Sequence, residues 1–317
     1  MAAATPGSDR ARVLVLRQLG LGDLLATVPA LRGLRTALPD SWVVLACPQA
    51  VGGLVRAAGL VDEVLATGEL EPVPWTGPPP DVGIDLHGSG PASHALVQAL
   101  RPRRLVAFGT DDPYVPGPPW WRDEHESHRW CRLVRAELGA PCDSDDRRLP
   151  PPSTPAPVED AVVLHVGAAS GSRRWPLERF AEVATRLSAG TQMVLTGSAA
   201  ERPLADRVAA AAGLPAAAVL AGRTTLDQLA ALVAAARLVI CGDTGVAHLA
   251  SAYVRPSVLL FGPTPPAWWG PPANGPHTVL WHGHGVGDPH AEHTDPALLA
   301  ITVAEVLAAA YARLRRD

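Results

Sequence analysis

An acid, a hydroxyl, a glycine and a histidine stand where a strand-like apolar run gives way to a helical pattern: Asp243, Thr244, Gly245 and His248, within ICGDTGVAHLASAY. In an open α/β sheet, ligands bind at the carboxyl ends of the strands, beside the start of the next helix. A helix start offers unpaired N–H groups and a partial positive charge, which suit phosphate. The segment therefore predicts a binding site for a phosphate compound.

A loop of small residues that ends in two arginines, GAASGSRRWP, follows another strand-like run. The small side chains of Gly167, Ala168 and Ser170 let the backbone approach a ligand closely. Arg173 and Arg174 are then placed to clamp a phosphate. The alternative interpretation is a solvated loop with surface arginines.

The turn LTGSAAE ends a third strand-like run and contains Thr196 and Gly197. These residues could contact a nucleotide, or they could cap the following helix, since Thr is a favoured cap. We assign them to the same phosphate site, with capping as the simpler alternative.

A glycine-rich turn also follows the first strand-like run, in RQLGLGDLLATVPAL. Gly20 and Gly22 match the start of a dinucleotide fingerprint, but Leu25 stands where the third glycine is expected, so the turn gives little support to a dehydrogenase. Asp23 lies near the start of the predicted helix. It is either a helix cap or a carboxylate available as a general base, and the two roles are compatible.

Other candidate motifs are weaker. The triplet DSD (143–145) imitates a metal-binding D-x-D but precedes a proline-rich linker, with no strand ending there. The histidines of 277–293 fit no metal-ligand spacing and are interpreted as a solvated loop. The sequence shows no G-x-S-x-G elbow and no Walker motif, which argues against a hydrolase or a P-loop ATPase. We predict no metal and no cofactor.

Composition excludes several classes of protein. The net charge of −4 gives no case for a nucleic-acid partner. The four cysteines are scattered without a CxxC pair, so we expect neither a disulfide framework nor a zinc site, and a reducing cytoplasm is the expected location. No apolar run approaches 18 residues and the first residues lack a signal-peptide layout, so no membrane insertion is expected. The chain contains no lysine.

Strand-like runs alternate with helical patterns along the chain, which indicates an α/β fold with parallel sheets covered by helices. Strands are predicted at 12–16, 42–46, 61–65, 82–86, 105–109, 161–167, 191–197, 237–243 and 257–262. Helices are predicted at 23–38, 49–58, 91–100, 176–189, 200–212, 225–236, 244–253 and 296–316. The segment 149–160, with four prolines within 150–155, is predicted as a linker between two similar domains, and 263–295 as a loop.

Six motifs occur in one order, and together they resemble glycosyltransferase family 9, the heptosyltransferases. They are GDLLATVPAL, GAASGSRRWP, LTGSAAE, LAGRTTLDQLAALV, CGDTGVAHLASAY and VLLFGPTPPAWWGP, and the resemblance runs across roughly residues 12–272. The resemblance implies a GT-B fold of two Rossmann-like domains. Residues 1–150 would bind the acceptor, residues 151–295 would bind the nucleotide-sugar donor, and the helix of 296–317 could pack back on the N-terminal domain.

The resemblance also implies an inverting, metal-independent transfer from a nucleotide-diphosphate sugar, typically ADP-heptose. Asp23 would be the general base. Arg174 stands where the family usually has lysine, with Arg173 beside it, and the planar fork of an arginine is not equivalent to an ammonium group. The Asp243–His248 segment would hold the sugar and the diphosphate.

We assign Gly22, Asp85 and His87 to the acceptor site, and Asp85 or His87 would be the next candidates if Asp23 is not the base. In the family the acceptor is usually the inner core of lipopolysaccharide. The Arg-, Ala- and Pro-rich composition, typical of a GC-rich genome, is also compatible with a small natural-product acceptor such as an aminocyclitol. Two alternatives stay open: a UDP- or GDP-sugar transferase of the same fold, and a non-catalytic nucleotide-sugar-binding protein.

Overall fold

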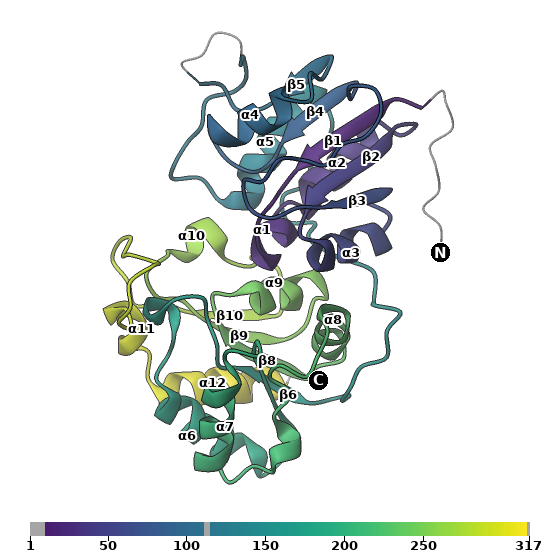
Figure 1. Cartoon of the computed structure of the whole chain (residues 1–317). Helices are drawn as coiled ribbons and strands as arrows, with labels where there is room; N and C mark the ends of the chain where they lie inside the picture. Colours follow the sequence, from purple (N-terminus) through teal and green to yellow (C-terminus); the bar gives the residue numbers. More distant parts are fainter. Residues whose placement is uncertain (1–9, 111–114, 316–317) are drawn as a thin grey trace. The chain divides into compact units, whose positions relative to one another are not determined.

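The computed structural model describes residues 10–110 and 115–315. The chain divides into two compact units, Met1–Leu149 and Pro150–Asp317 (Figure 1). Residues 150–160, where the prolines cluster, contain neither helix nor strand.

The first unit contains a five-stranded parallel sheet with the order β3-β2-β1-β4-β5. Its strands are β1 (Arg12–Leu16), β2 (Trp42–Cys47), β3 (Glu63–Ala66), β4 (Val82–Asp85) and β5 (Arg104–Val106). All six residues of β2 are buried, as expected for a Val- and Leu-rich strand covered on both faces. Its helices are α1 (Leu21–Ala26), α2 (Val28–Ala37), α3 (Gln49–Ala57), α4 (Ala92–Gln98) and α5 (Glu126–Leu138).

The second unit contains another parallel sheet, with the order β10-β9-β8-β6-β7. Its strands are β6 (Val162–His165), β7 (Met193–Thr196), β8 (Leu238–Gly242), β9 (Ser257–Leu260) and β10 (His277–Leu280). Its helices are η1 (Gly171–Arg173), α6 (Leu177–Ser188), α7 (Arg202–Ala211), η2 (Ala216–Ala218), α8 (Leu226–Ala234), α9 (Gly245–Ala252), α10 (Pro266–Trp269), α11 (Pro296–Ala300) and α12 (Val303–Leu314).

Two isolated bridges give the sheets the same strand order. Val219, between β7 and β8 in the chain, pairs in parallel with Leu195 of β7. Pro119, after β5, pairs in parallel with Gly109. With these bridges each sheet follows the order third-second-first-fourth-fifth-sixth, which is the strand order of Rossmann folds.

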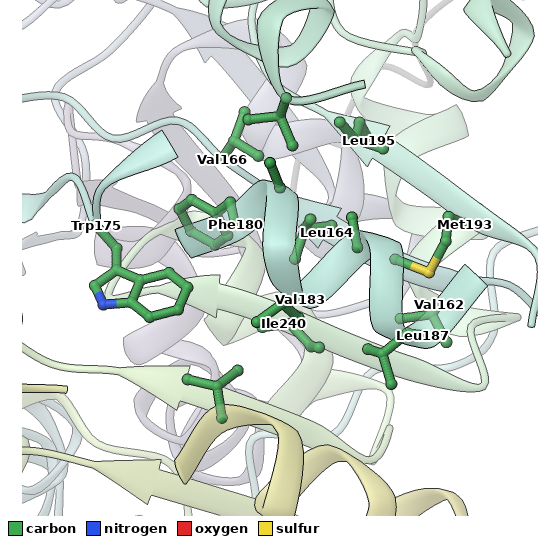
Figure 2. Packing of buried hydrophobic residues seen from close by; sticks show 14 of the residues in the cluster. Val162, Leu164, Val166, Trp175, Phe180, Val183, Leu187, Met193, Leu195 and Ile240 are labelled. Atoms are coloured by element: carbon green, nitrogen blue, oxygen red, sulfur yellow. The ribbon is translucent and has the colours of Figure 1, made fainter. Parts of the chain in front are cut away.

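The core of the second unit lies between α6 and the strands β6, β7 and β8. Figure 2 shows Val162, Leu164 and Ile240 of the strands packed against Val183 and Leu187 of α6.

Trp175 closes one end of this core. It is 2% exposed, and its ring packs edge-on against Phe180 with the ring centres 5.0 Å apart. Its indole N–H donates to the Ile301 carbonyl at 3.1 Å. Burial of this tryptophan anchors the end of the loop that carries Arg173 and Arg174.

The α/β architecture with parallel sheets is confirmed, and several boundaries differ from the sequence prediction. The first predicted helix is two helices, α1 and α2. Helix α1 ends before Thr27, and α2 begins after it, with Pro29 at its second position. The last is α11 and α12, because Thr302 starts a new helix with a capping box to Glu305. The predicted loop 263–295 contains α10 and the edge strand β10.

The last helix, α12, packs against α6 and the strands β8, β9 and β10. These contacts lie within the second unit, and the further possibility that the C-terminal helix packs back on the N-terminal domain stays a prediction.

One cysteine pair departs from the expectation of unpaired cysteines: Cys131 of α5 and Cys142 form a disulfide. Gly139 adopts a left-handed conformation at the end of α5 and reverses the chain, which brings the two Cα atoms to 5.5 Å. Cys47 and Cys241 are buried and free.

Candidate functional site

In the second unit, the polar segments singled out from the sequence follow β6 and β8. The chain continues from β6 to β7 on one side and reaches β8 on the other, so the strand order reverses between β6 and β8. Ligands of doubly wound sheets bind at the carboxyl ends of the strands at this switch point. The loop of Gly167–Arg174 leaves β6 there, and Asp243–His248 leaves β8 there.

Arg173 joins these two segments. Its Nη2 donates to the backbone carbonyl of Asp243 and lies 3.5 Å from Oδ2 of the Asp243 carboxylate. Both side chains are mostly covered, with 27% and 11% of their surfaces exposed. Arg173 therefore holds the start of the Asp243 segment against the loop after β6.

Arg174 is held differently. Its Nε donates to the Ala168 carbonyl at 3.0 Å. Among the described residues its Nη groups make no hydrogen bond, and it interacts electrostatically with Glu201. One edge of this guanidinium therefore fixes its orientation while the other stays available to an anion.

Glu201 accepts from the Ser198 N–H at 2.7 Å. Burial raises the pKa of the Glu201 carboxyl, but the Ser198 hydrogen bonds, His165 and Arg174 outweigh burial and lower it overall. Glu201 is thus held as a carboxylate near the loop after β6.

Two glycines of the loop after β6 lie close to other segments: Gly171 faces the backbone, whereas Gly167 faces the movable end of the Glu201 side chain. A Cβ on Gly171 would lie 1.6 Å from the Glu292 carbonyl oxygen, and one on Gly167 would lie 2.1 Å from the Glu201 carboxylate carbon. The Ser170 hydroxyl donates to the Pro289 carbonyl at 2.5 Å. Segment 289–292 thus packs against the loop after β6.

Helix α9 starts at Gly245 after Thr244, which is extended (φ −144°, ψ 172°) and makes no side-chain capping bond. The first N–H groups of the helix are consequently not satisfied by a cap from Thr244. His248 is buried one turn later, and its ring meets Trp269 of α10 edge-on at 6.0 Å.

Thr196 turns into the protein. Its hydroxyl lies 3.0 Å from Nδ1 of His165. Neither Thr196 nor Gly197 caps α7, because the N-cap residue of that helix is Glu201. Burial lowers the pKa of His165, with Glu201 opposing this effect, so the imidazole is held neutral.

In the first unit, the strand order reverses between β1 and β4, and polar residues follow both strands. Arg17, directly after β1, is 1% exposed. Its guanidinium donates to the Asp23 carbonyl at 2.9 Å and to the Leu86 carbonyl at 2.6 Å. It also donates to Oε1 of Glu126 at 2.8 Å, so it binds three separate segments at this edge.

Asp23 is in the first turn of α1, whose N-cap is Gly20, so Asp23 is not itself the N-cap residue. Its side chain keeps 33% of its surface exposed, and Oδ1 lies 3.6 Å from Nη2 of Arg17. Burial raises the pKa of the Asp23 carboxyl above 3.8, while Arg17 opposes the rise and Glu126 adds to it. Gly22 precedes it in the same helix.

Glu126 is buried at the start of α5 and is surrounded by donors. Arg17, the Trp130 indole and Arg129 all donate to its carboxylate. Burial raises the pKa of Glu126, but Arg17 and Arg129 outweigh burial and lower it overall. The guanidinium of Arg17 also lies 4.9 Å from the centre of the Trp130 ring.

Asp85 and His87 lie at the end of β4. Asp85 is buried, and its Oδ1 accepts from the His87 N–H at 2.7 Å. Its Oδ2 is 3.6 Å from Nε2 of the buried His94, and burial raises its pKa. His87 accepts from the Gln18 N–H at Nδ1, and burial lowers its pKa. Asp85 is therefore directed into the protein, whereas His87 lies beside the turn that follows β1.

Arg17 and Glu126 were not singled out from the sequence. Arg17 directly follows a strand-like run, which by itself is only a weak indication of a functional residue. Glu126 lies in a stretch to which the sequence analysis assigned no helix, and it meets Arg17 across 109 positions of the chain. No local pattern indicates such a pair.

The discounted motifs have other partners. Asp143 accepts from the Asp145 N–H in a turn, and Asp145 faces Arg147. His282 contacts Glu305 at 2.7 Å and His277 contacts Ser257 at 2.8 Å. Within residues 10–110 and 115–315 no three His, Cys, Asp or Glu side chains are grouped as a metal site. None of the helices described there is long and apolar enough to cross a bilayer.

Two parallel sheets of one strand order, each with polar residues at its switch point, make this a two-domain α/β protein of the GT-B class. The family profile described as glycosyltransferase family 9 (heptosyltransferase) matches residues 128–297. This is more than half of the chain, so the chain belongs to glycosyltransferase family 9.

Curated relatives match in part. Over 144 residues the chain is 35% identical to lipopolysaccharide heptosyltransferase 2 of Escherichia coli K12, covering 43% of this chain and 41% of that protein. Over 111 residues it is 43% identical to lipopolysaccharide heptosyltransferase 1 of Pseudomonas aeruginosa, covering 34% of this chain and 30% of that protein. The chain thus spans less than half the length of these relatives.

Solved structures match over almost the whole chain. The ADP-heptose lipopolysaccharide heptosyltransferase II of E. coli has a TM-score of 0.78 at 21% identity, covering 96% of this chain and 99% of that one. A family 9 glycosyltransferase from Veillonella parvula has a TM-score of 0.78 at 19% identity, covering 98% of each chain. At these identities the likeness shows the fold.

Proposed function

We propose that this protein transfers a heptose from ADP-heptose to a hydroxyl group of an acceptor, with inversion at the anomeric carbon and without a metal ion. The observation that carries the proposal is the arrangement at the β6–β8 switch point. A loop with two arginines and the start of α9 meet there, joined by Arg173 and Asp243.

The donor half of the proposal uses the second unit. The N–H groups at the start of α9 and the available edge of Arg174 bind the diphosphate. As the bond from the anomeric carbon to the diphosphate breaks, these groups stabilise the charge on the leaving oxygen. Asp243 and His248 then hold the sugar.

The acceptor half uses the first unit. The acceptor oxygen attacks the anomeric carbon from the face opposite the diphosphate, and Asp23 takes the proton of that hydroxyl as the new bond forms. The partly exposed carboxylate of Asp23 suits this role. His87 and Gly22 line the same region of the proposed acceptor site.

The relatives support ADP-heptose as the donor, since one similar structure is that of an ADP-heptose transferase. Their names also support the lipopolysaccharide core as the acceptor class. The composition is also compatible with a natural-product core, so the acceptor test includes both. A UDP- or GDP-sugar donor, or nucleotide-sugar binding without transfer, are the competing functions.

Binding and turnover test the proposal together. Thermal shift and calorimetry with ADP-heptose, UDP-sugars and GDP-sugars should show stabilisation by ADP-heptose, since a ligand of the native state raises the melting temperature by mass action. Transfer should then persist in excess EDTA. Preference for a UDP- or GDP-sugar would replace the donor, and binding without transfer to either acceptor class would favour a binding protein.

The triplet DSD supplies a control for the metal. Asp143→Asn should leave transfer unchanged, because Asp143 accepts from the backbone of its own turn. Loss of transfer in EDTA, restored by magnesium or manganese, would contradict the metal-free mechanism.

A further inference from the structure

Arg17 lies at the carboxyl ends of β1 and β4, where the strand order of the first sheet reverses. One buried guanidinium binds the backbone of the Asp23 turn, the chain after β4 and the carboxylate of Glu126 on α5. The three segments are far apart in sequence, so a change in the position of Arg17 would move all of them relative to one another.

The charges around Asp23 are arranged unequally. Nη2 of Arg17 lies 2.8 Å from Oε1 of Glu126 but 3.6 Å from Oδ1 of Asp23. The same nitrogen therefore makes a hydrogen-bonded ion pair with Glu126 and only a longer contact with the carboxylate of Asp23. A lone arginine beside an aspartate would hold it as a weakly basic ion-pair partner.

We propose that Arg17 and Glu126 are positioning residues for Asp23: Arg17 fixes the turn that carries Asp23, and Glu126 draws the guanidinium charge away from its carboxylate. The inference rests on the proposed function, in which Asp23 is the base. Neither residue touches the reacting atoms. Both act by setting the place of Asp23 and its affinity for a proton.

Other charged groups near Asp23 are few among the described residues. Arg17 after β1, Glu126 on α5 and His87 after β4 interact with it electrostatically. Arg129 stands behind Glu126 and shares its carboxylate. The Gly20 N–H also stabilises the Asp23 carboxylate.

The test compares Glu126→Gln with Glu124→Gln in the full chain. Glutamine at 126 keeps an acceptor oxygen for Arg17 and Trp130 but removes the negative charge. Glu124 is a matched control, since it is two residues away and pairs with Arg132 at 2.6 Å instead of with Arg17.

The first measurement is the pKa of the Asp23 carboxyl in the ligand-free protein, by carbon-detected NMR, with the signal assigned from Asp23→Asn. The second is the pH profile of kcat/KM. Glu126→Gln should lower the pKa of Asp23 by about one unit, the usual scale for a neighbouring charge, and the acid limb of the profile should move with it. Glu124→Gln should leave both in place.

Should Glu126→Gln fail to fold, Arg129→Gln provides a second test, because it changes the effect of the Glu126 charge on Asp23 in the opposite direction. Without Arg129 the charge of Glu126 is less neutralised, so the pKa of Asp23 should rise. An unchanged pKa of Asp23 in either folded variant would overturn the inference. A pKa that shifts while the acid limb stays in place would keep the positioning role but show that Asp23 is not the base.

Discussion

The guanidinium of Arg173 binds Asp243 at two points, the backbone carbonyl and the carboxylate. The two residues are 70 positions apart and follow different strands of the second sheet. This engagement makes Arg173 part of the framework of the β6–β8 edge, so we expect its neighbour Arg174 to be the cation that meets a ligand.

Substitution of Arg174 should therefore affect the donor. Arg174→Ala should weaken binding of an ADP-sugar by about 10- to 100-fold, because a charged hydrogen bond to the diphosphate contributes about 1.5–3 kcal/mol. Arg174→Lys should retain much of the affinity, since it keeps the positive charge. Calorimetry measures both constants.

Arg173→Ala is the contrasting variant. It removes the bonds to Asp243, so it should lower the melting temperature, whereas Arg174→Ala should leave it nearly unchanged. Equal loss of donor affinity without loss of stability in Arg173→Ala would reverse the assignment of the two arginines.

Asp23→Asn should keep the fold while turnover falls by about 10²–10⁴-fold, the usual scale for a general base. Burial raises the pKa of Asp23 in the folded protein, so the ionised carboxylate adds no stability at neutral pH, and its loss should cost none. Rate assays and thermal unfolding at pH 7 separate the two effects. A variant that melts early but turns over normally when folded would make Asp23 a structural residue.

The stability of the second unit should decrease as pH falls below about 6.5. Burial lowers the pKa of His165 from 6.5, so the unfolded chain binds a proton there before the folded unit does. The loss begins at the unfolded pKa and continues down to the lower folded pKa. Denaturant unfolding at several pH values, with His165→Gln as comparison, measures it, and a variant with the same dependence would contradict the assignment.

Gly171→Ala should destabilise the loop after β6, because its Cβ would overlap the Glu292 carbonyl. We expect a loss of about 1–3 kcal/mol, typical of overpacking, together with weaker donor binding. Gly190→Ala is the matched control, since among the described residues, its own chain neighbours aside, no atom lies within 4 Å of its Cβ position. Equal melting temperatures for the two variants would show that the 292 segment yields easily.

The sheets could be predicted from the sequence because buried parallel strands are runs of Val and Leu, and β1 was bounded correctly. The loop after β6 was singled out because small residues and two arginines follow such a run, and the loop after β8 because an acid, a hydroxyl and a glycine follow one. Strand β10 was missed because HTVL is a half-buried edge strand within a Pro-, Gly- and His-rich segment. The Arg17–Glu126 pair depends on how α5 packs, which local patterns do not encode.

Each sheet is built from one uninterrupted stretch of chain, with α12 packed on the second sheet and the proline segment as the connection. A recombination crossover in the codons of residues 150–160 would therefore join two different polypeptide halves without dividing either sheet. Homologous recombination at this position could exchange one half of the gene for that of a relative and leave every strand pairing intact. The protein is in this sense modular, and under the proposed function a change of acceptor preference and a change of donor preference would fall on separate halves of the gene.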